Sequence, residues 1–136
     1  MRIYLASSYR RRVELQGYAD DLRACGHTVT SRWLDGSHDS CDDATPSDEQ
    51  RASWAREDLD DIRGSDALVL YTDDDSGRGG CMVELGYALG YGLLVFVVGP
   101  RANVFCCLPR VEWFATWAEA LAYYLMDKEI KAGVAW

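Results

Sequence analysis

Two short runs of uninterrupted apolar residues, Ala67–Tyr71 (ALVLY) and Leu93–Val98 (LLVFVV), limit the fold most strongly. Runs without alternating polar positions are typical of strands buried on both faces of a parallel sheet. Parallel neighbours require a crossover connection, usually a helix, and the mainly apolar segment from Cys81 to about Gly90 lies between the two runs. This part of the chain therefore predicts a right-handed βαβ unit.

The amino-terminal part of the chain repeats the same alternation. Arg2–Ala6 (RIYLA) predicts a short strand, and His27–Trp33 (HTVTSRW), which is rich in β-branched and aromatic residues, predicts a second one. The helix expected between them ends naturally at Gly26. The apolar residues that would share one face of this helix are Leu15, Tyr18, Ala19 and Leu22.

Loops and helix caps divide the remaining chain. The only long loop runs through the polar segment 35–46, and Ser47–Gln50 (SDEQ) is a capping-box sequence that begins a helix ending at Gly64. Val111–Phe114 predicts a short edge strand, and Thr116–Glu119 opens a last helix with a second capping box. The apolar stripe of the helix after the loop would consist of Trp54, Ala55, Leu59 and Ile62.

Strands that alternate with helices predict an α/β architecture. We expect a single flavodoxin-like or Rossmann-like domain with a five-stranded parallel sheet and helices on both faces. The 136 residues suffice for one core but not for two, and we expect the domain to span residues 1–127, with a loose tail at 128–136. Ligands of such sheets bind beyond the carboxyl ends of the strands, so the loops after Ala6 and Tyr71 are the expected location of the chemistry.

Composition excludes several functional classes. The formal net charge of −8 argues against sequence-independent binding of duplex nucleic acid, because binding of that kind needs a basic surface. No window approaches the run of about 18 apolar residues that a membrane helix requires, and the amino terminus reads directly into a strand. Five cysteines without a Cys-x-x-Cys pair indicate reduced thiols, and no metal site is suggested. We therefore expect a soluble cytoplasmic protein.

Glu84 is the first candidate for a catalytic role. It lies one turn into the helix that begins near Cys81, in otherwise apolar sequence. A carboxylate there would be partly dehydrated and yet be kept ionised by the positive end of the helix dipole, which suits a nucleophile. From the local pattern alone, a glutamate that only stabilises its own helix end is an equally good explanation. The glycine-rich loop directly before the helix favours the functional role.

Asp58 is the second candidate. Helical spacing places it four residues from both Trp54 and Ile62, at the border of the apolar stripe. Taken alone, it is better explained as an ordinary aspartate at the rim, next to Asp60 and Asp61. Together with Glu84, however, it could form the two-carboxylate arrangement of a retaining glycosidase.

Two loops offer groups that could bind substrate. Ser8 and Arg10 follow the first strand, where a hydroxyl, backbone amides and a guanidinium can surround a phosphate, although a simple helix cap is also plausible. In the turn 75–80 (DSGRGG), Asp75, Ser76, Gly77 and Gly79 permit close backbone approach to a ligand. The turn lacks the Lys and Ser/Thr of a P-loop. The two histidines, His27 and His38, belong to no constellation and receive no role.

Four segments together resemble the nucleoside 2-deoxyribosyltransferase family: Tyr4–Ser8 (YLASS), Asp58–Ile62 (DLDDI), Asp75–Gly77 (DSG) and Val83–Ala88 (VELGYA). The resemblance implies a flavodoxin-like fold and a covalent glycosyl intermediate on the glutamate at position 84. It further implies that Asp58 holds the sugar or moves a proton to the leaving base, that Tyr4 orients the nucleophile and that Asp75 lies near the base. No metal or organic cofactor is implied.

The same family contains base-exchanging transferases and hydrolases of nucleoside 5′-monophosphates. Ser8 and Arg10 resemble the phosphate-contacting residues of the hydrolase branch, which implies a nucleotide substrate and water as the acceptor. Family members are dimers or larger, and Asn103, in the loop after the fourth strand, is the candidate for completing a neighbour's site. An NAD glycohydrolase and a non-catalytic nucleotide sensor are the alternatives to these two activities.

Overall fold

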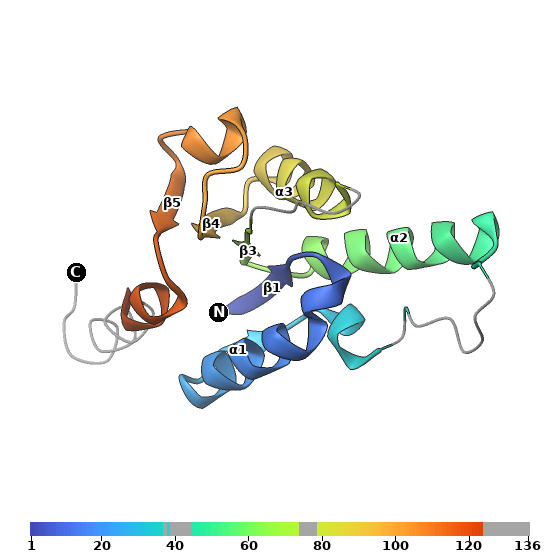
Figure 1. Ribbon diagram of the computed structural model, residues 1–136, viewed down its shortest axis with the longest axis horizontal. Helices are drawn as coiled ribbons and strands as arrows, with labels where there is room; N and C mark the ends of the chain where they lie inside the picture. The colour runs from blue at the N-terminus through green and yellow to red at the C-terminus, as the bar shows by residue number, and fades with distance from the viewer. Residues whose placement is uncertain (37, 39–44, 74–78, 124–136) are drawn as a thin grey trace.

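A computed structural model describes residues 1–36, 38, 45–73 and 79–123. Five parallel strands form one sheet in the order β2-β1-β3-β4-β5 (Figure 1). The strands are β1 (Arg2–Ala6), β2 (Thr28–Val29), β3 (Ala67–Tyr71), β4 (Leu94–Val98) and β5 (Val111–Phe114), the α-helices are α1 (Arg12–Ala24), α2 (Asp48–Arg63) and α3 (Gly80–Tyr91), and the short 3-10 helices are η1 (Tyr9–Arg11), η2 (Arg32–Asp35) and η3 (Val104–Cys107). The flavodoxin-like order and the five-stranded parallel sheet are therefore confirmed.

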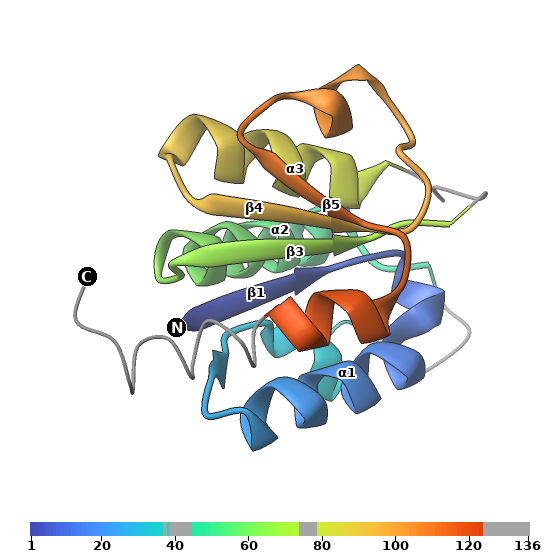
Figure 2. The ribbon, with the colours of Figure 1, turned by 90° about the vertical axis from the view of Figure 1, so that its left-hand side faces the viewer.

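Helices cover both faces of this sheet. The helices α2 and α3 lie against one face, while α1 and a last helix, which occupies residues 117–123 within the described chain, lie against the other (Figures 1 and 2). The last helix is held to α1 because the Trp117 indole stacks on Tyr18 at 4.4 Å and donates a hydrogen bond to Asp21 at 2.9 Å. Two layers of helices thus cover the central strands of the sheet and leave their ends open.

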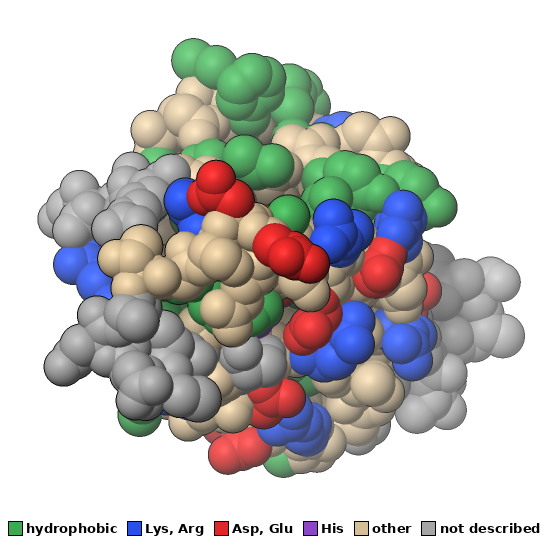
Figure 3. Space-filling view, turned by 90° about the vertical axis from the view of Figure 1, so that its right-hand side faces the viewer, with side chains coloured by type: hydrophobic (Ala, Val, Ile, Leu, Met, Phe, Trp, Pro, Cys, Tyr) green, Lys and Arg blue, Asp and Glu red, His purple; other side chains and the backbone are tan. Residues whose placement is uncertain are grey.

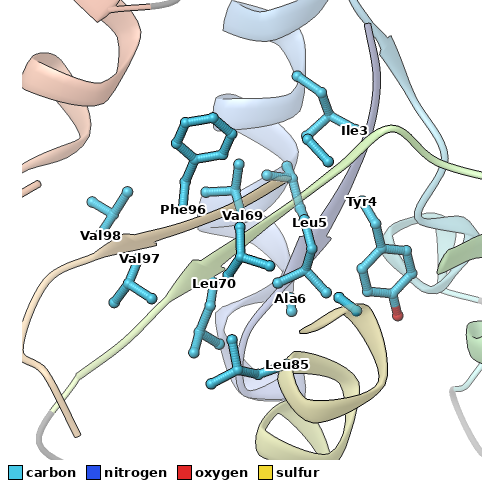
Figure 4. Packing of buried hydrophobic residues seen from close by; sticks show 14 of the residues in the cluster. Ile3, Tyr4, Leu5, Ala6, Val69, Leu70, Leu85, Phe96, Val97 and Val98 are labelled. Atoms are coloured by element: carbon cyan, nitrogen blue, oxygen red, sulfur yellow. The ribbon is translucent and has the colours of Figure 1, made fainter. Parts of the chain in front are cut away.

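The core follows the apolar runs in the sequence. Apart from the first residue of β1 and of β4 and the last residue of β3, the side chains of these three strands are almost completely buried, and Leu85 of α3 packs against them (Figure 4). Tyr4 is the polar exception in β1, with a side chain that is 0% exposed. Figure 4 shows its ring lying to one side of the aliphatic cluster, with the hydroxyl oxygen at the far end. A buried hydroxyl needs a polar environment, and the carboxyl groups of Glu84 and Asp58 provide it here.

The second strand is shorter than predicted. The sequence predicts a strand over His27–Trp33, but only Thr28–Val29 pairs with β1, and the chain then turns into η2. Side chains replace the missing strand, because the Ser31 hydroxyl contacts the backbone N and O of Leu5 at 2.6 and 3.2 Å and the Trp33 indole donates to the same oxygen at 2.9 Å. Since the backbone of β1 is satisfied in this way, Trp33 can turn toward the carboxyl end of the sheet.

Both capping boxes are found at helix starts. The Ser47 hydroxyl accepts a hydrogen bond from Gln50 N at 3.1 Å, and the Thr116 hydroxyl accepts one from Glu119 N at 3.3 Å. The predicted apolar stripe of α2 is only partly correct: Ile62 is fully buried, but Trp54 and Leu59 are half-buried and Ala55 is exposed. The reason is that the first turns of α2 extend beyond the sheet (Figure 1).

The surface carries mixed charge. On the face in Figure 3, acidic and basic side chains alternate instead of forming one basic area, and hydrophobic groups gather along its upper edge. No helix in the described ranges is long and apolar enough to span a membrane. The expected tail at 128–136 lies outside the described residues.

Candidate active site

A cavity of about 510 Å³ opens at the carboxyl end of β1, beside the first turn of α3. This is the edge of the sheet at which the order of the strands predicts a ligand site. Its lining combines residues from both halves of the chain: Ser7, Ser8, Tyr9, Arg10, Trp33, His38, Asp58, Gly80, Cys81 and Glu84. Of the residues predicted from the sequence, Ser8, Arg10, Asp58 and Glu84 therefore meet in one place.

Glu84 reaches the cavity from the second turn of α3. The helix starts after Gly79, whose φ of 83° is a left-handed conformation that glycine adopts easily. The carboxylate oxygen Oε2 is closed off from solvent and has no hydrogen-bond partner among the described residues. Burial raises the pKa of Glu84 to about 8, an interaction with Tyr4 lowers it, and the nearby Asp58 raises it further. The raised pKa runs against the expectation that the helix dipole keeps this group ionised, and burial is its largest cause.

Asp58 reaches the same cavity from α2. Its side chain is 20% exposed, and its Oδ1 is enclosed without a hydrogen-bond partner in the described ranges. Burial raises the pKa of Asp58 to about 7, and the neighbouring carboxylates of Asp61 and Glu57 add to the rise. Asp58 and Glu84 are thus two carboxyl groups that hold protons near neutral pH, an arrangement that suits proton transfer at this pH.

Tyr4 links these two carboxyl groups. Burial, followed by the charges of Glu84 and Asp58, raises the pKa of its phenol well above the ordinary value, so the hydroxyl keeps its proton. The hydroxyl is close enough to stabilise the charged form of either carboxylate, which lowers both of their pKa values. However, it makes no well-formed hydrogen bond with a described residue. All three groups can therefore turn to a ligand.

The end of β1 supplies the polar rim. Ser7 donates its hydroxyl hydrogen to Tyr71 O at 2.9 Å, which joins the ends of β1 and β3. Arg10, just beyond Ser8, donates to Asp73 Oδ2 at 3.1 Å, and Arg11 pairs with the same carboxylate. Because a guanidinium has five donors, Arg10 can hold Asp73 and still offer hydrogen to an anionic ligand.

Aromatic side chains form a wall that the sequence did not predict. The ring of His38 stacks on Trp54 at 5.2 Å and on Tyr9 at 6.3 Å, and Tyr9 in turn lies 6.1 Å from Trp33. Burial lowers the pKa of His38, so the imidazole is neutral near pH 7. A histidine in a long polar loop gives no signal in the sequence, since only the fold brings it to the carboxylates.

The family model for nucleoside 2-deoxyribosyltransferase matches residues 3–128, which is nearly the whole described chain. The chain belongs to this family. Its fold and its cavity agree with that assignment, and the two carboxyl groups with Tyr4 lie within the matched region. The activity is accordingly glycosyl transfer or cleavage of an N-glycosidic bond.

Two solved structures share the fold of this deoxyribosyltransferase family member. The 2-deoxyribosyltransferase of the psychrotolerant bacterium Bacillus psychrosaccharolyticus is 22% identical, with a TM-score of 0.73 over 94% of this chain and 96% of that chain. The CMP N-glycosidase of Clostridium botulinum is 16% identical, with a TM-score of 0.60 over 90% of this chain and 97% of that chain. No curated protein sequence matches the chain.

The remaining predicted residues lie apart from this cavity or outside the described chain. Gly79 precedes α3 at the cavity edge, whereas Asp75, Ser76 and Gly77 belong to the segment that the structure does not describe. Asn103 is absent from the lining and caps η3, because its Oδ1 accepts from Phe105 N at 2.9 Å. Asn103 therefore lies outside the cavity of the single chain.

Proposed function

We propose that this deoxyribosyltransferase-family enzyme is an N-hydrolase that cleaves the N-glycosidic bond of a nucleoside 5′-monophosphate or (deoxy)nucleoside, with Glu84 as nucleophile and water as acceptor. One observation carries the proposal: Glu84 and Asp58 line one cavity large enough for a nucleotide together with Ser8 and Arg10, and the buried Tyr4 interacts with both carboxyl groups. Two carboxyl groups flanking one site are the arrangement that retaining glycoside hydrolysis uses.

In the first step of the proposed mechanism, a Glu84 oxygen forms a bond to the anomeric carbon. The bond from that carbon to the base nitrogen breaks, its electron pair leaves with the base, and Asp58 supplies a proton to the base. Water then attacks the glycosyl–Glu84 ester, Asp58 takes up the proton of the water, and the sugar departs with retained configuration. The hydroxyl of Tyr4 donates to the Glu84 carboxylate and holds it in place.

The pKa values of Glu84 and Asp58 are compatible with a nucleophile and a proton donor, respectively. Glu84 must be anionic to attack, and Asp58 must carry a proton, whereas burial raises the pKa of Glu84 to about 8 and that of Asp58 to about 7. Such a pair titrates as a unit. During the reaction the anomeric carbon of the sugar develops positive charge. This charge stabilises the anionic form of the nearer carboxyl group, which is Glu84 in this proposal. The shared proton therefore moves toward Asp58.

Arg10 and Ser8 support a phosphorylated substrate. Both line the cavity where the amino end of η1 begins, and a guanidinium binds phosphate with charge-assisted hydrogen bonds. Arg10 already forms an ion pair with the carboxylate of Asp73. This ion pair favours a substrate without a phosphate, which is an uncharged nucleoside. Base exchange between nucleosides is therefore the second candidate function.

A homodimer or larger assembly is part of the proposal. Apolar side chains are exposed on α3 and η3, including Val83 (68%), Tyr91 (57%), Val104 (76%) and Phe105 (58%). A surface of this kind is typical of protein–protein contact. Asn103, which lies directly before η3, would then face a neighbouring protomer. We also propose that the protein acts in the cytoplasm.

The test of the function is chromatographic. Wild-type protein is incubated with nucleosides and 5′-monophosphates, with and without a second free base, and release of the base is followed. We expect release from monophosphates without an added base. Glu84→Gln should reduce it by about three orders of magnitude or more, because the nucleophile is removed, whereas Glu112→Gln on the exposed side of β5 should have no effect. Turnover that requires a second base would instead establish a transferase.

A further inference from the structure

His38 places a second polar atom beside Asp58 in the cavity wall. Its Nε2 lies 3.6 Å from Asp58 Oδ1, which is beyond hydrogen-bond distance, and its side chain is only 11% exposed. Both atoms are enclosed, and neither has a hydrogen-bond partner within the described parts of the chain. Unsatisfied buried polar atoms are costly and rare, so a neighbouring pair that faces a cavity indicates a ligand.

The aromatic stack fixes the position of this imidazole. Trp54 of α2 stacks on the ring with an interplanar angle of 23°, and Tyr9 of η1 stacks on it with an angle of 17°. Trp54 stands four residues before Asp58 on the same face of α2. The helix that presents the carboxyl group therefore also supports the imidazole, and the two polar atoms share one side of the site.

We propose that His38 binds the departing nucleobase together with Asp58. The inference rests on the proposed cleavage of an N-glycosidic bond. A neutral imidazole with its proton on Nε2 donates to a carbonyl oxygen or ring nitrogen of the base, while the Asp58 carboxyl group delivers its proton to the base. As the glycosidic bond breaks, its electron pair moves to the base, and the hydrogen bond from His38 strengthens with the growing negative charge.

This role predicts a particular kinetic signature. An interaction that strengthens in the transition state raises kcat more than it lowers KM. It should also matter only where negative charge develops on the base. A ring-methylated cationic base, such as 3-methylcytosine or 7-methylguanine, leaves as a neutral molecule and does not need the hydrogen bond or the proton.

The experiment compares His38→Phe, which keeps a stacking ring but has no nitrogen, with wild type. The substrates are a nucleotide that wild type cleaves and the cationic ring-methylated form of the same nucleotide. We expect kcat for the ordinary nucleotide to fall by about 10- to 100-fold, and kcat for the cationic one to stay within about threefold. The matched control His27→Phe changes the other histidine, which contacts the amino-terminal Met1 at 3.0 Å, and should leave both rates unchanged.

A second variant and a melting measurement distinguish loss of the hydrogen bond from misfolding. His38→Gln retains a side-chain donor and should recover part of the lost kcat, and thermal melting reports whether each variant is folded. Equal losses on both substrates would overturn the proposal, because they indicate a structural role. Unchanged kcat in folded His38→Phe would overturn it as well. If wild type releases no base from any nucleotide or nucleoside, the proposed function fails, and this inference fails with it.

Discussion

Asp58 and Asp73 are two aspartates near one cavity, and their surroundings give them opposite character. Asp73 forms ion pairs with the guanidinium groups of Arg10 and Arg11. Asp58 lines the cavity near other carboxylates, and burial raises its pKa to about 7. The fold thus pairs one aspartate with cations, whereas it surrounds the other with acidic groups and suits it to be the proton donor of the proposed mechanism.

The sharpest test of this difference removes the proton carrier. Asp58→Asn keeps the size of the side chain but cannot deliver a proton, so base release from an ordinary nucleotide should fall by about 10² to 10⁴-fold. The measurement is kcat by chromatography, with Asp60→Asn on the exposed face of α2 as the control. Loss of the same size on a cationic ring-methylated nucleotide would contradict proton transfer, since that base leaves without a proton.

A smaller effect is expected at the rim. Arg10→Gln should raise KM for a 5′-monophosphate about tenfold, because one charge-assisted hydrogen bond contributes roughly 1.5–3 kcal/mol, and should leave the corresponding nucleoside unaffected. Arg23→Gln is a matched control, since Arg23 is similarly exposed and pairs with Asp20 at 3.2 Å. Equal KM changes for nucleoside and nucleotide would contradict phosphate binding by Arg10.

A substitution of Asp73, the partner of Arg10, also tests phosphate binding at the rim. Asp73→Asn removes a negative charge next to the expected phosphate, so KM for the monophosphate should fall a few-fold as repulsion decreases. Steady-state kinetics with nucleotide and nucleoside measure the effect. A rise in KM would show that Asp73 instead holds the arginines in position for the ligand.

The sequence predicts the sheet better than it predicts the site. Strands and helix caps depend on residues that are close in sequence, so a local pattern is enough to predict them. Examples are the apolar run Ala67–Tyr71 and the caps at Ser47 and Thr116. The strand ending at Val29 was predicted too long because the side chain of Ser31 replaces backbone pairing. No local pattern could show this replacement, since its partner Leu5 lies 26 residues away.

The sequence predicts those site residues that belong to a recognisable motif. It does not predict those that reach the site only through tertiary contacts. Glu84 and Asp58 stand in recognisable segments of the family, and both line the cavity. His38 and Trp54 are 16 positions apart in the sequence, and their rings meet only in the folded chain. The protonation of Glu84 was also missed, because desolvation depends on what surrounds the side chain in space.

The smallest expected effect concerns stability, and it tests the burial of Glu84 without any substrate. The pKa of Glu84 rises from 4.5 to about 8 on folding, so its contribution to stability is complete below pH 4.5 and is lost as the pH rises toward 8. Glu84→Gln cannot ionise and should escape that loss. The variant should therefore melt at least a few degrees above wild type at pH 8–9, with the difference vanishing near pH 4. Thermal melting across this range, with Glu112→Gln as the exposed control, measures it. A difference in melting temperature between variant and wild type that is the same at all pH values would mean that Glu84 is ionised in the folded protein. A positive charge in the site would then have to compensate for the burial of Glu84 beside Asp58 and Tyr4.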